Sequence, residues 1–400
     1  MAEQEWSNWS GSLRFVPGRV VAPDNEETLA DIIRRAAADG HTVRVAGAGH
    51  SSVPLVETDG ILVSLENFRG LELVDSSANV VAMQAGMTLK EAGESLLESG
   101  LALHNLGDVD MQTVVGAIGT GTHGTGRRLR DLSSALTGVR MVTARGDIIE
   151  RTFERDSNFI RASRVSLGTL GIFTTLQLKL LPAYTLRRRE WCTHVDDCMT
   201  HLDELVEENR NFDFYWYPRS DEVKLRVMDH PGKGTDELPF AKLTEDKTGW
   251  SAEVIPKTRI LKFDEMEYAL PAAAGPACFQ EVRRRIKERH RRNVGWRVLY
   301  RTVAEDDTFL SNEYGRDTVT ISLHQNAGLP FHDFFKDIED IFRYHDGRPH
   351  WGKKHNLTAA ELRPLYPMWD RFQEIRSHMD RDGTFLNPYL RELLGVEPGD

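Results

Sequence analysis

A mixed α+β fold in two domains is predicted by three features of the sequence. Helix and strand patterns alternate through the first 182 residues, and the glycine clusters are confined to the same region. Beyond Pro182 the charge density rises and these clusters disappear. A chain of 400 residues, 40% of them hydrophobic, is also long enough to form more than one core.

Helix boundaries in the first region follow from capping residues. Asp24 with Glu27 predicts a helix start, and Gly40 predicts its end before the strand "TVRVAG". Thr88 with Glu91 repeats the capping pattern at the start of "LKEAGESLLES". Strands are expected at "ILVSL", "NVVAMQAG", on both sides of the turn "ARGD", and at "GIFTTLQLKLLP".

The second region is predicted to contain longer, more charged elements. We expect a helix at "HVDDCMTHLDELVEENR", strands at "FDFYWYP" and "KLRVM", and a long loop from "DHPGKGTDELPF" to "EDKTGW". The basic stretch "VRRRIKERHRRN", residues 282–293, is interpreted as a solvated helix face rather than a nucleic-acid site.

Composition excludes several classes of function. Lys and Arg number 50 against 61 Asp and Glu, and the net charge of -11 argues against nucleic acid or an anionic membrane as partner. The three cysteines lack the spacing of a disulfide framework or a metal site, so we expect free thiols and no bound metal. The N-terminus resembles no signal peptide and no window is apolar enough to span a bilayer, so a cytoplasmic protein is expected.

Two glycine-rich stretches are the strongest functional signals. "GAGHSS" lacks the third glycine of a Rossmann fingerprint, and "GTGTHGTG" is followed by "RRLRD" instead of an apolar helix. Loops of glycine and hydroxyl residues can instead surround a pyrophosphate with backbone N–H groups. Two such loops predict one extended cofactor, although ordinary turns are the simpler alternative for either loop alone.

These stretches belong to a wider resemblance. "VRVAGAGHSS...TDGILVSLENFRGL", "GLALHNLGDVDMQTVVGAIGTGTHGTG", "RPHWGKKH" and "FLNPYLRELLG" resemble the sugar-lactone and alditol oxidases of the vanillyl-alcohol oxidase flavoprotein superfamily. The resemblance implies a two-lobed FAD-binding domain over 1–182 and an α+β substrate-binding cap over 183–349. It also implies that residues 350–400 return toward the flavin.

The resemblance further implies that His50 bonds covalently to the 8α-methyl carbon of FAD. A neutral imidazole in a loop of small residues suits that chemistry. His123 is expected to shape the flavin loop rather than react. The full set of expected cofactor-binding residues is Gly47, Ala48, Gly49, His50, Ser51, Ser52, Gly116, Gly119, Thr120, Gly121, Thr122, His123, Gly124, Gly126, Gly171 and Ile172.

Alcohol oxidation by a flavin needs positive charge near the reacting hydroxyl. The resemblance assigns that role to Lys353 and Arg301, although ordinary ion pairs are the alternative for both. Strand alternation directs Ser322 and His324 to the same side. His324 is a candidate proton acceptor, and a structural core histidine is an equal alternative. Glu267 and His350 are further candidates for the pocket wall.

Substrate choice depends on residue 299. Alditol oxidases resemble this chain but have glutamate two positions before the arginine, where this chain has Leu299. We therefore expect oxidation at C2 of an L-gulono-, L-galactono- or D-arabinono-1,4-lactone, with alditols such as xylitol or sorbitol as the alternative. A lactone hydrolase or a sugar-binding protein would not need the glycine loops. Oxygen or another acceptor would reoxidise the flavin; small residues at Gly116 and Ala117 are compatible with oxygen.

Overall fold

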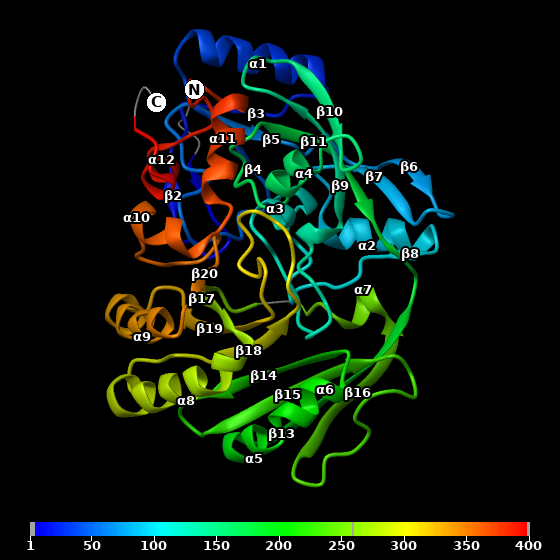
Figure 1. Cartoon of the computed structure of the whole chain (residues 1–400), viewed down its shortest axis with the longest axis vertical. Helices are drawn as coiled ribbons and strands as arrows, with labels where there is room; N and C mark the ends of the chain where they lie inside the picture. Colours follow the sequence, from blue (N-terminus) through cyan, green and yellow to red (C-terminus); the bar gives the residue numbers. More distant parts are fainter. Residues whose placement is uncertain (1–4, 258–259, 398–400) are drawn as a thin grey trace.

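Two sheets formed by the first half of the chain make up the upper lobe of the computed structural model (Figure 1), which describes residues 5–257 and 260–397. The parallel sheet has the order β3 (Arg19–Val21), β5 (Ile61–Ser64), β4 (Val43–Ala46). The antiparallel sheet has the order β10 (Ile148–Thr152), β9 (Leu136–Val142), β11 (Ile172–Lys179), β7 (Val80–Gln84), β6 (Leu71–Asp75).

Helices and short hairpins complete this half of the chain. The strands predicted at "ILVSL", "NVVAMQAG", around "ARGD" and at "GIFTTLQLKLLP" are confirmed as β5, β7, β9, β10 and β11. The remaining elements are β1 (Trp6–Ser7), β2 (Arg14–Phe15), α1 (Glu26–Ala38), α2 (Leu89–Glu98), β8 (Leu101–Ala102), α3 (Val114–Gly119), α4 (Ser157–Arg164) and β12 (Leu181–Pro182).

The predicted cap of α1 is wrong by one residue, whereas that of α2 is confirmed. The Asn25 side chain accepts a hydrogen bond from the Thr28 N–H at 2.8 Å, and Asp24 instead accepts one from Asn67. Both Asp and Asn are good caps, so the sequence alone does not decide between neighbours. At α2, Thr88 and Glu91 form a reciprocal capping box.

One antiparallel sheet of eight strands dominates the lower lobe (Figure 1). Its order is β16 (Lys242–Trp250), β13 (Thr185–His194), β15 (Glu222–Asp229), β14 (Asn211–Tyr217), β18 (Val298–Val303), β19 (Thr318–Asn326), β17 (Phe263–Pro271), β20 (Arg348–Pro349). The helices of this part are α5 (Val195–Thr200), α6 (Leu202–Glu208), α7 (Ser251–Val254), α8 (Gly275–Arg285) and α9 (His332–Tyr344).

Two predictions for this region are wrong. The single helix expected at 194–210 is divided at His201, whose ring stacks on Phe240 at a centroid distance of 4.2 Å. The second part of the expected long loop forms β16, an edge strand with alternating half-buried and exposed side chains. Charged side chains are common on edge strands because they oppose pairing with other chains, and here they mask the strand pattern.

Residues after β20 return to the upper lobe. The helices α10 (Ala359–Leu362), α11 (Trp369–Met379) and α12 (Pro388–Leu394), orange to red in Figure 1, lie against it. The Val43 N–H donates to the Thr384 carbonyl at 2.8 Å, which attaches the C-terminal segment to β4. The Asn387 side chain donates to the Pro54 carbonyl at 2.8 Å and thereby contacts the loop after β4.

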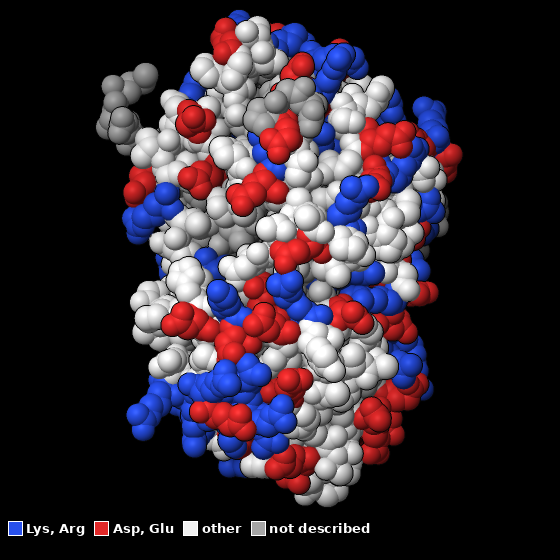
Figure 2. All heavy atoms as spheres, turned by 60° about the vertical axis from the view of Figure 1, so that its left-hand side comes forward, with Lys and Arg blue, Asp and Glu red and all other residues white. Residues whose placement is uncertain are grey.

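The basic stretch at 282–293 and the three cysteines lie in the described part of the chain. Basic side chains on the lower lobe are interspersed with acidic ones (Figure 2), and α8 arginines pair with Asp196 and Asp337. All three cysteines are free thiols. Among the described residues, no helix combines the length and apolarity needed to cross a bilayer.

Candidate active site

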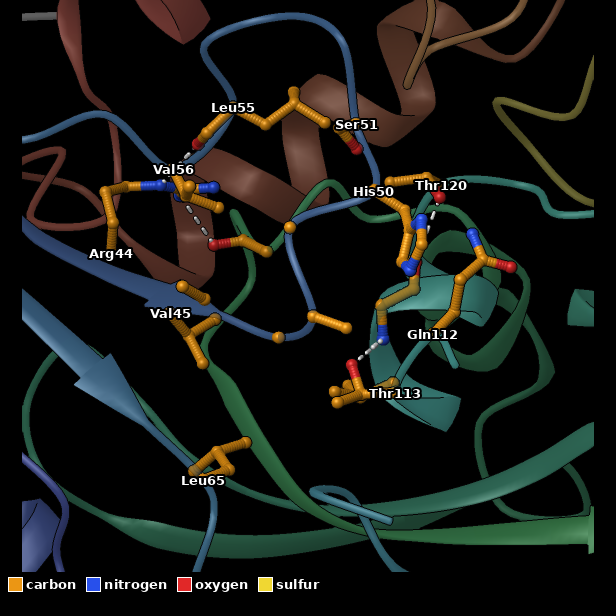
Figure 3. A pocket seen from close by; sticks show the side chains of 18 of the residues that line it. Arg44, Val45, His50, Ser51, Leu55, Val56, Leu65, Gln112, Thr113 and Thr120 are labelled. Carbon is orange, nitrogen blue, oxygen red and sulfur yellow. Dashed lines mark hydrogen bonds between the residues drawn. The ribbon is translucent and has the colours of Figure 1, made fainter. Parts of the chain in front are cut away.

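The glycine loop after β4 borders a cavity of about 320 Å³ in the upper lobe. Figure 3 shows Arg44 and His50 on opposite sides of this cavity. Nine of the residues expected to bind the cofactor line it: Gly47, Ala48, Gly49, His50, Ser51, Gly116, Gly119, Thr120 and Gly171. Segments from β4, α3 and the 166–171 loop therefore meet around one elongated space.

The loop of residues 47–51 requires small residues and offers free donors. A Cβ on Gly47 would lie 2.2 Å from the Thr113 Oγ1 atom, and Gly49 has φ +69°. Within the described chain, the backbone N–H groups of residues 48–51 donate no hydrogen bond to another residue. Adjacent unused N–H donors beside a cavity are suited to a pyrophosphate, so this loop fits FAD.

Arg44 fixes the segments that enclose this cavity. Its guanidinium is buried and donates to the carbonyls of Leu55, Leu167, Gly168 and Phe385. Burial lowers the pKa of Arg44 to about 10, so it stays charged at neutral pH. A single side chain therefore joins the His50 loop, the 166–171 loop and the C-terminal segment.

His50 lines both this cavity and a second, smaller one. Its ring stacks on Trp9 at a centroid distance of 5.3 Å, and Figure 3 shows it near Gln112 and Thr120. Burial, together with the charge of Lys353, lowers the pKa of His50 to about 4. The imidazole is therefore neutral at physiological pH, the state needed for a nucleophile.

The second cavity, of about 100 Å³, is enclosed partly by one face of the large sheet and is called here the substrate chamber. Register places Leu299 beside Ser322, and Ser322 beside Glu267. In the next row, His324 on β19 lies beside Glu265 on β17. Cross-strand neighbours point to the same face of a sheet, so strands far apart in sequence contribute to a single wall.

Glu267 is the centre of a buried network in this wall. Its carboxylate accepts hydrogen bonds from Arg301 Nη2 at 2.5 Å and from His123 Nε2 at 2.7 Å. The Ser322 hydroxyl also donates a hydrogen bond to the Glu267 carboxylate. Ser322 itself is not among the residues that line the chamber. Burial would raise the pKa of Glu267, but the charges of Arg301 and His123 hold it well below its usual range.

Lys353 forms the second ion pair of the chamber, with Glu265. His324 Nε2 lies 3.6 Å from the other oxygen of the same carboxylate. Burial opposes ionisation of Glu265, yet Lys353 and His324 lower its pKa. Burial lowers the pKa of His350 to about 3, so its imidazole is neutral. The chamber is therefore lined both by the cations Lys353 and Arg301 and by the neutral imidazoles of His50 and His350.

Several site residues lie elsewhere than expected or were missed. Ser52, Thr122 and His123 border the substrate chamber, whereas Gly121, Gly124, Gly126 and Ile172 line neither cavity. Glu265 was missed, although the alternation that selects Glu267 applies equally to residue 265. The other lining residues without a sequence prediction are Trp9, Ser10, Gly107, Asp108, Val109, Gln112, Phe263, Arg297 and Gly352.

Comparison with known proteins assigns a family to each of the two parts of the chain. The sequence matches the FAD binding domain family over residues 17–152 and the D-arabinono-1,4-lactone oxidase family over residues 176–247 and 238–393. The chain belongs to the D-arabinono-1,4-lactone oxidase family. As a member with an FAD-binding domain, it is an FAD-linked oxidoreductase. The resemblance inferred from the sequence is thereby confirmed.

Several relatives align with nearly the whole length of this chain. The L-gulono-1,4-lactone dehydrogenase of Mycobacterium tuberculosis is 34% identical, with 98% of this chain and 99% of the relative covered. The L-gulonolactone oxidase of Bos taurus is 26% identical, with 98% of each covered. The alditol oxidase of a Streptomyces species is 28% identical, with 97% of this chain and 98% of the relative covered.

The fold is shared with more distant proteins of known structure. The crystal structure of cholesterol oxidase from B. sterolicum superposes with a TM-score of 0.86 at 16% identity, and 98% of this chain and 96% of that chain are covered. This likeness confirms the predicted mixed fold of the FAD-binding domain and cap. At this identity it establishes the fold alone.

Proposed function

We propose that this protein oxidises the C2 hydroxyl of an aldono-1,4-lactone, using FAD attached covalently to His50. Residues 1–182 would hold the FAD, 183–349 would form the substrate cap, and 350–400 would complete the site. The observation that carries the proposal is the position of His50 between the two cavities. One cavity has the loops for an extended cofactor, and the other has the charged groups for a polar substrate.

Bound FAD would supply the hydride acceptor for the carbon that is oxidised. Lys353 and Arg301 would hold the substrate hydroxyl and stabilise negative charge as it develops on that oxygen. Their partners Glu265 and Glu267 would keep the two cations in fixed positions. His324 is our candidate for the group that takes the hydroxyl proton, since its imidazole lies in the same wall.

Leu299 supports a lactone over an open-chain alditol. A flexible polyol presents many hydroxyl donors, and an apolar side chain leaves some without an acceptor, at a cost of about 1 to 3 kcal/mol. A lactone ring has fewer torsions to fix and an apolar edge that suits Leu299. Alditol oxidation is the second candidate because Glu267, two strands away from Leu299, provides a carboxylate in the same wall.

The test is a comparison of specificity constants for matched substrates. We expect kcat/KM for L-gulono-1,4-lactone to exceed that for xylitol or sorbitol in the unmodified enzyme. Parallel assays in air and with an artificial dye would distinguish oxygen from another electron acceptor. A clear preference for an alditol would contradict the lactone assignment.

A further inference from the structure

Arg297 lines the substrate chamber and has no place in the mechanism above. It precedes β18 by one residue, and its carbonyl accepts a hydrogen bond from the His324 N–H at 3.1 Å. Residues 297, 299 and 301 alternate onto one face of the extended chain. Four residues of extended chain span about 13 Å, so the backbones of Arg297 and Arg301 are well separated along the chamber wall.

Arg301 contacts one of the two glycine-rich loops that are expected to bind the flavin. The Arg301 side chain donates to the carbonyl of His123, which belongs to the glycine-rich loop at 119–126. The Arg297 guanidinium lies over Tyr215 on β14, on the opposite side of β18 from His324 on β19. A substrate oxidised beside Arg301 would direct its far end toward Arg297.

The Arg297 guanidinium is held by aromatic rings and not by an acid. Its central carbon lies 3.8 Å from the centroid of the Tyr215 ring and 4.3 Å from that of Trp296. The residue is only 6% exposed, and its Nε atom is buried without a hydrogen-bond partner. Among residues 5–257 and 260–397, Arg297 makes no side-chain hydrogen bond and no ion pair. Aromatic faces orient a guanidinium but leave its N–H donors available.

The other cations of the chamber wall already have acidic partners. Arg301 pairs with Glu267, and Lys353 pairs with Glu265. Asp108, which also lines the chamber, forms an ion pair with Arg226, whose Nη1 atom lies 2.7 Å from Asp108 Oδ1. Arg226 also pairs with Asp213. Arg297, by contrast, has no acidic side chain within ion-pair distance among the described residues. A planar guanidinium with free N–H donors is the geometry that binds a carboxylate through two hydrogen bonds.

We propose that Arg297 forms a carboxylate-binding subsite at the far end of the chamber, and that the preferred substrate is a lactone with a carboxylate at its terminal carbon. Such a substrate is the lactone of a sugar diacid. The proposal rests on lactone oxidation as the function and specifies its substrate class. A neutral lactone would present only a terminal hydroxymethyl group to Arg297.

The experiment uses two lactones that differ only at that terminal carbon. They are L-gulono-1,4-lactone and its counterpart with a carboxylate in place of the C6 hydroxymethyl group, D-glucaro-6,3-lactone. We expect the wild-type holoenzyme to favour the carboxylated lactone in kcat/KM by at least about tenfold. In Arg297→Gln, kcat/KM for this lactone should fall about 10- to 100-fold, mainly through KM, because the lost contact is to the substrate carboxylate and not to the reacting carbon. The neutral lactone should be little affected.

Three controls separate this role from a structural one. Arg284→Gln removes a matched charge from a side chain that is 67% exposed and should change neither constant. Flavin content and Tm report folding; if Arg297→Gln does not fold, Arg297→Lys retains the charge and should retain part of the preference. Binding of each lactone, followed by the flavin difference spectrum, tests the subsite even if neither lactone is oxidised. Equal affinity for the two lactones, or an equal loss for both in the variant, would overturn the proposal.

Discussion

His50 lies where the two cavities meet, with a neutral imidazole beside the glycine loop. If it bonds to the flavin, acid precipitation of the wild-type enzyme will leave the yellow colour in the protein pellet. His50→Ala should release its flavin into the supernatant, because noncovalent contacts are lost on denaturation. His41→Ala, at an exposed position, should behave as wild type. A colourless wild-type pellet would rule out the covalent bond.

Lys353 provides the most direct test of the chamber chemistry. Lys353→Met removes the positive charge that we propose to lie near the reacting hydroxyl, and Lys353 is outside the cofactor loops. We expect flavin content to be unchanged and flavin reduction by substrate to slow by about 10²- to 10³-fold. Stopped-flow absorbance measures this step, with the exposed Lys90→Met as control. An unchanged reduction rate would remove Lys353 from the mechanism.

Buried histidines should make stability depend on pH. Burial lowers the pKa of His355 to about 4, whereas an unfolded histidine titrates near 6.5. Between these values the unfolded state binds more protons, so stability decreases as the pH falls from about 6.5 toward 4. His355 alone should cost about 2 kcal/mol between pH 7.5 and 5.0. Urea unfolding gives the free energy of unfolding at both pH values. The difference between the two values should be smaller in His355→Gln than in the wild type, whereas His41→Gln should show the wild-type difference.

At the scale of elements, Arg44 connects β4 with two loops and the C-terminal segment. Arg44→Met would leave four carbonyl groups, three of them in buried contacts, without this donor. We expect a loss of stability on the order of 3 kcal/mol and weaker flavin retention, because Leu55, Leu167 and Gly168 line the cofactor cavity. Thermal unfolding followed by flavin fluorescence tests this. The control Arg35→Met, at an exposed position, should leave Tm and flavin content unchanged. Unchanged values in Arg44→Met would show that the other contacts hold these segments in place.

Most elements could be predicted because their local signals agree with their environment. The strands β5, β7, β9 and β11 are apolar and buried, and the Thr88 capping box is both a sequence pattern and a hydrogen-bonded structure. The failures have local physical causes. β16 is polar because it is an edge strand, and the helix break at His201 depends on a tertiary contact with Phe240. Sequence periodicity does not report such contacts.

At the scale of the whole molecule, the arrangement of the site residues could not be predicted from the spacing of motifs in the sequence. His50, Arg301, Glu267 and Lys353 were all predicted from motifs and resemblance, and they meet around the two cavities. Their pairing was not predictable, because it depends on the register between β17, β18 and β19 and on the return of the C-terminal segment. That Arg297 has no acidic partner among the described residues likewise follows only from the assembled sheet.

The central claim is that this molecule oxidises lactones with a bound flavin, and anaerobic flavin bleaching tests it most directly. Purified enzyme should be yellow, and adding L-gulono-1,4-lactone without oxygen should abolish the visible flavin absorbance as hydride is transferred. Readmitting oxygen or a dye should restore the colour. A folded, colourless protein, or a yellow one whose absorbance is unchanged by any aldonolactone, would contradict the account.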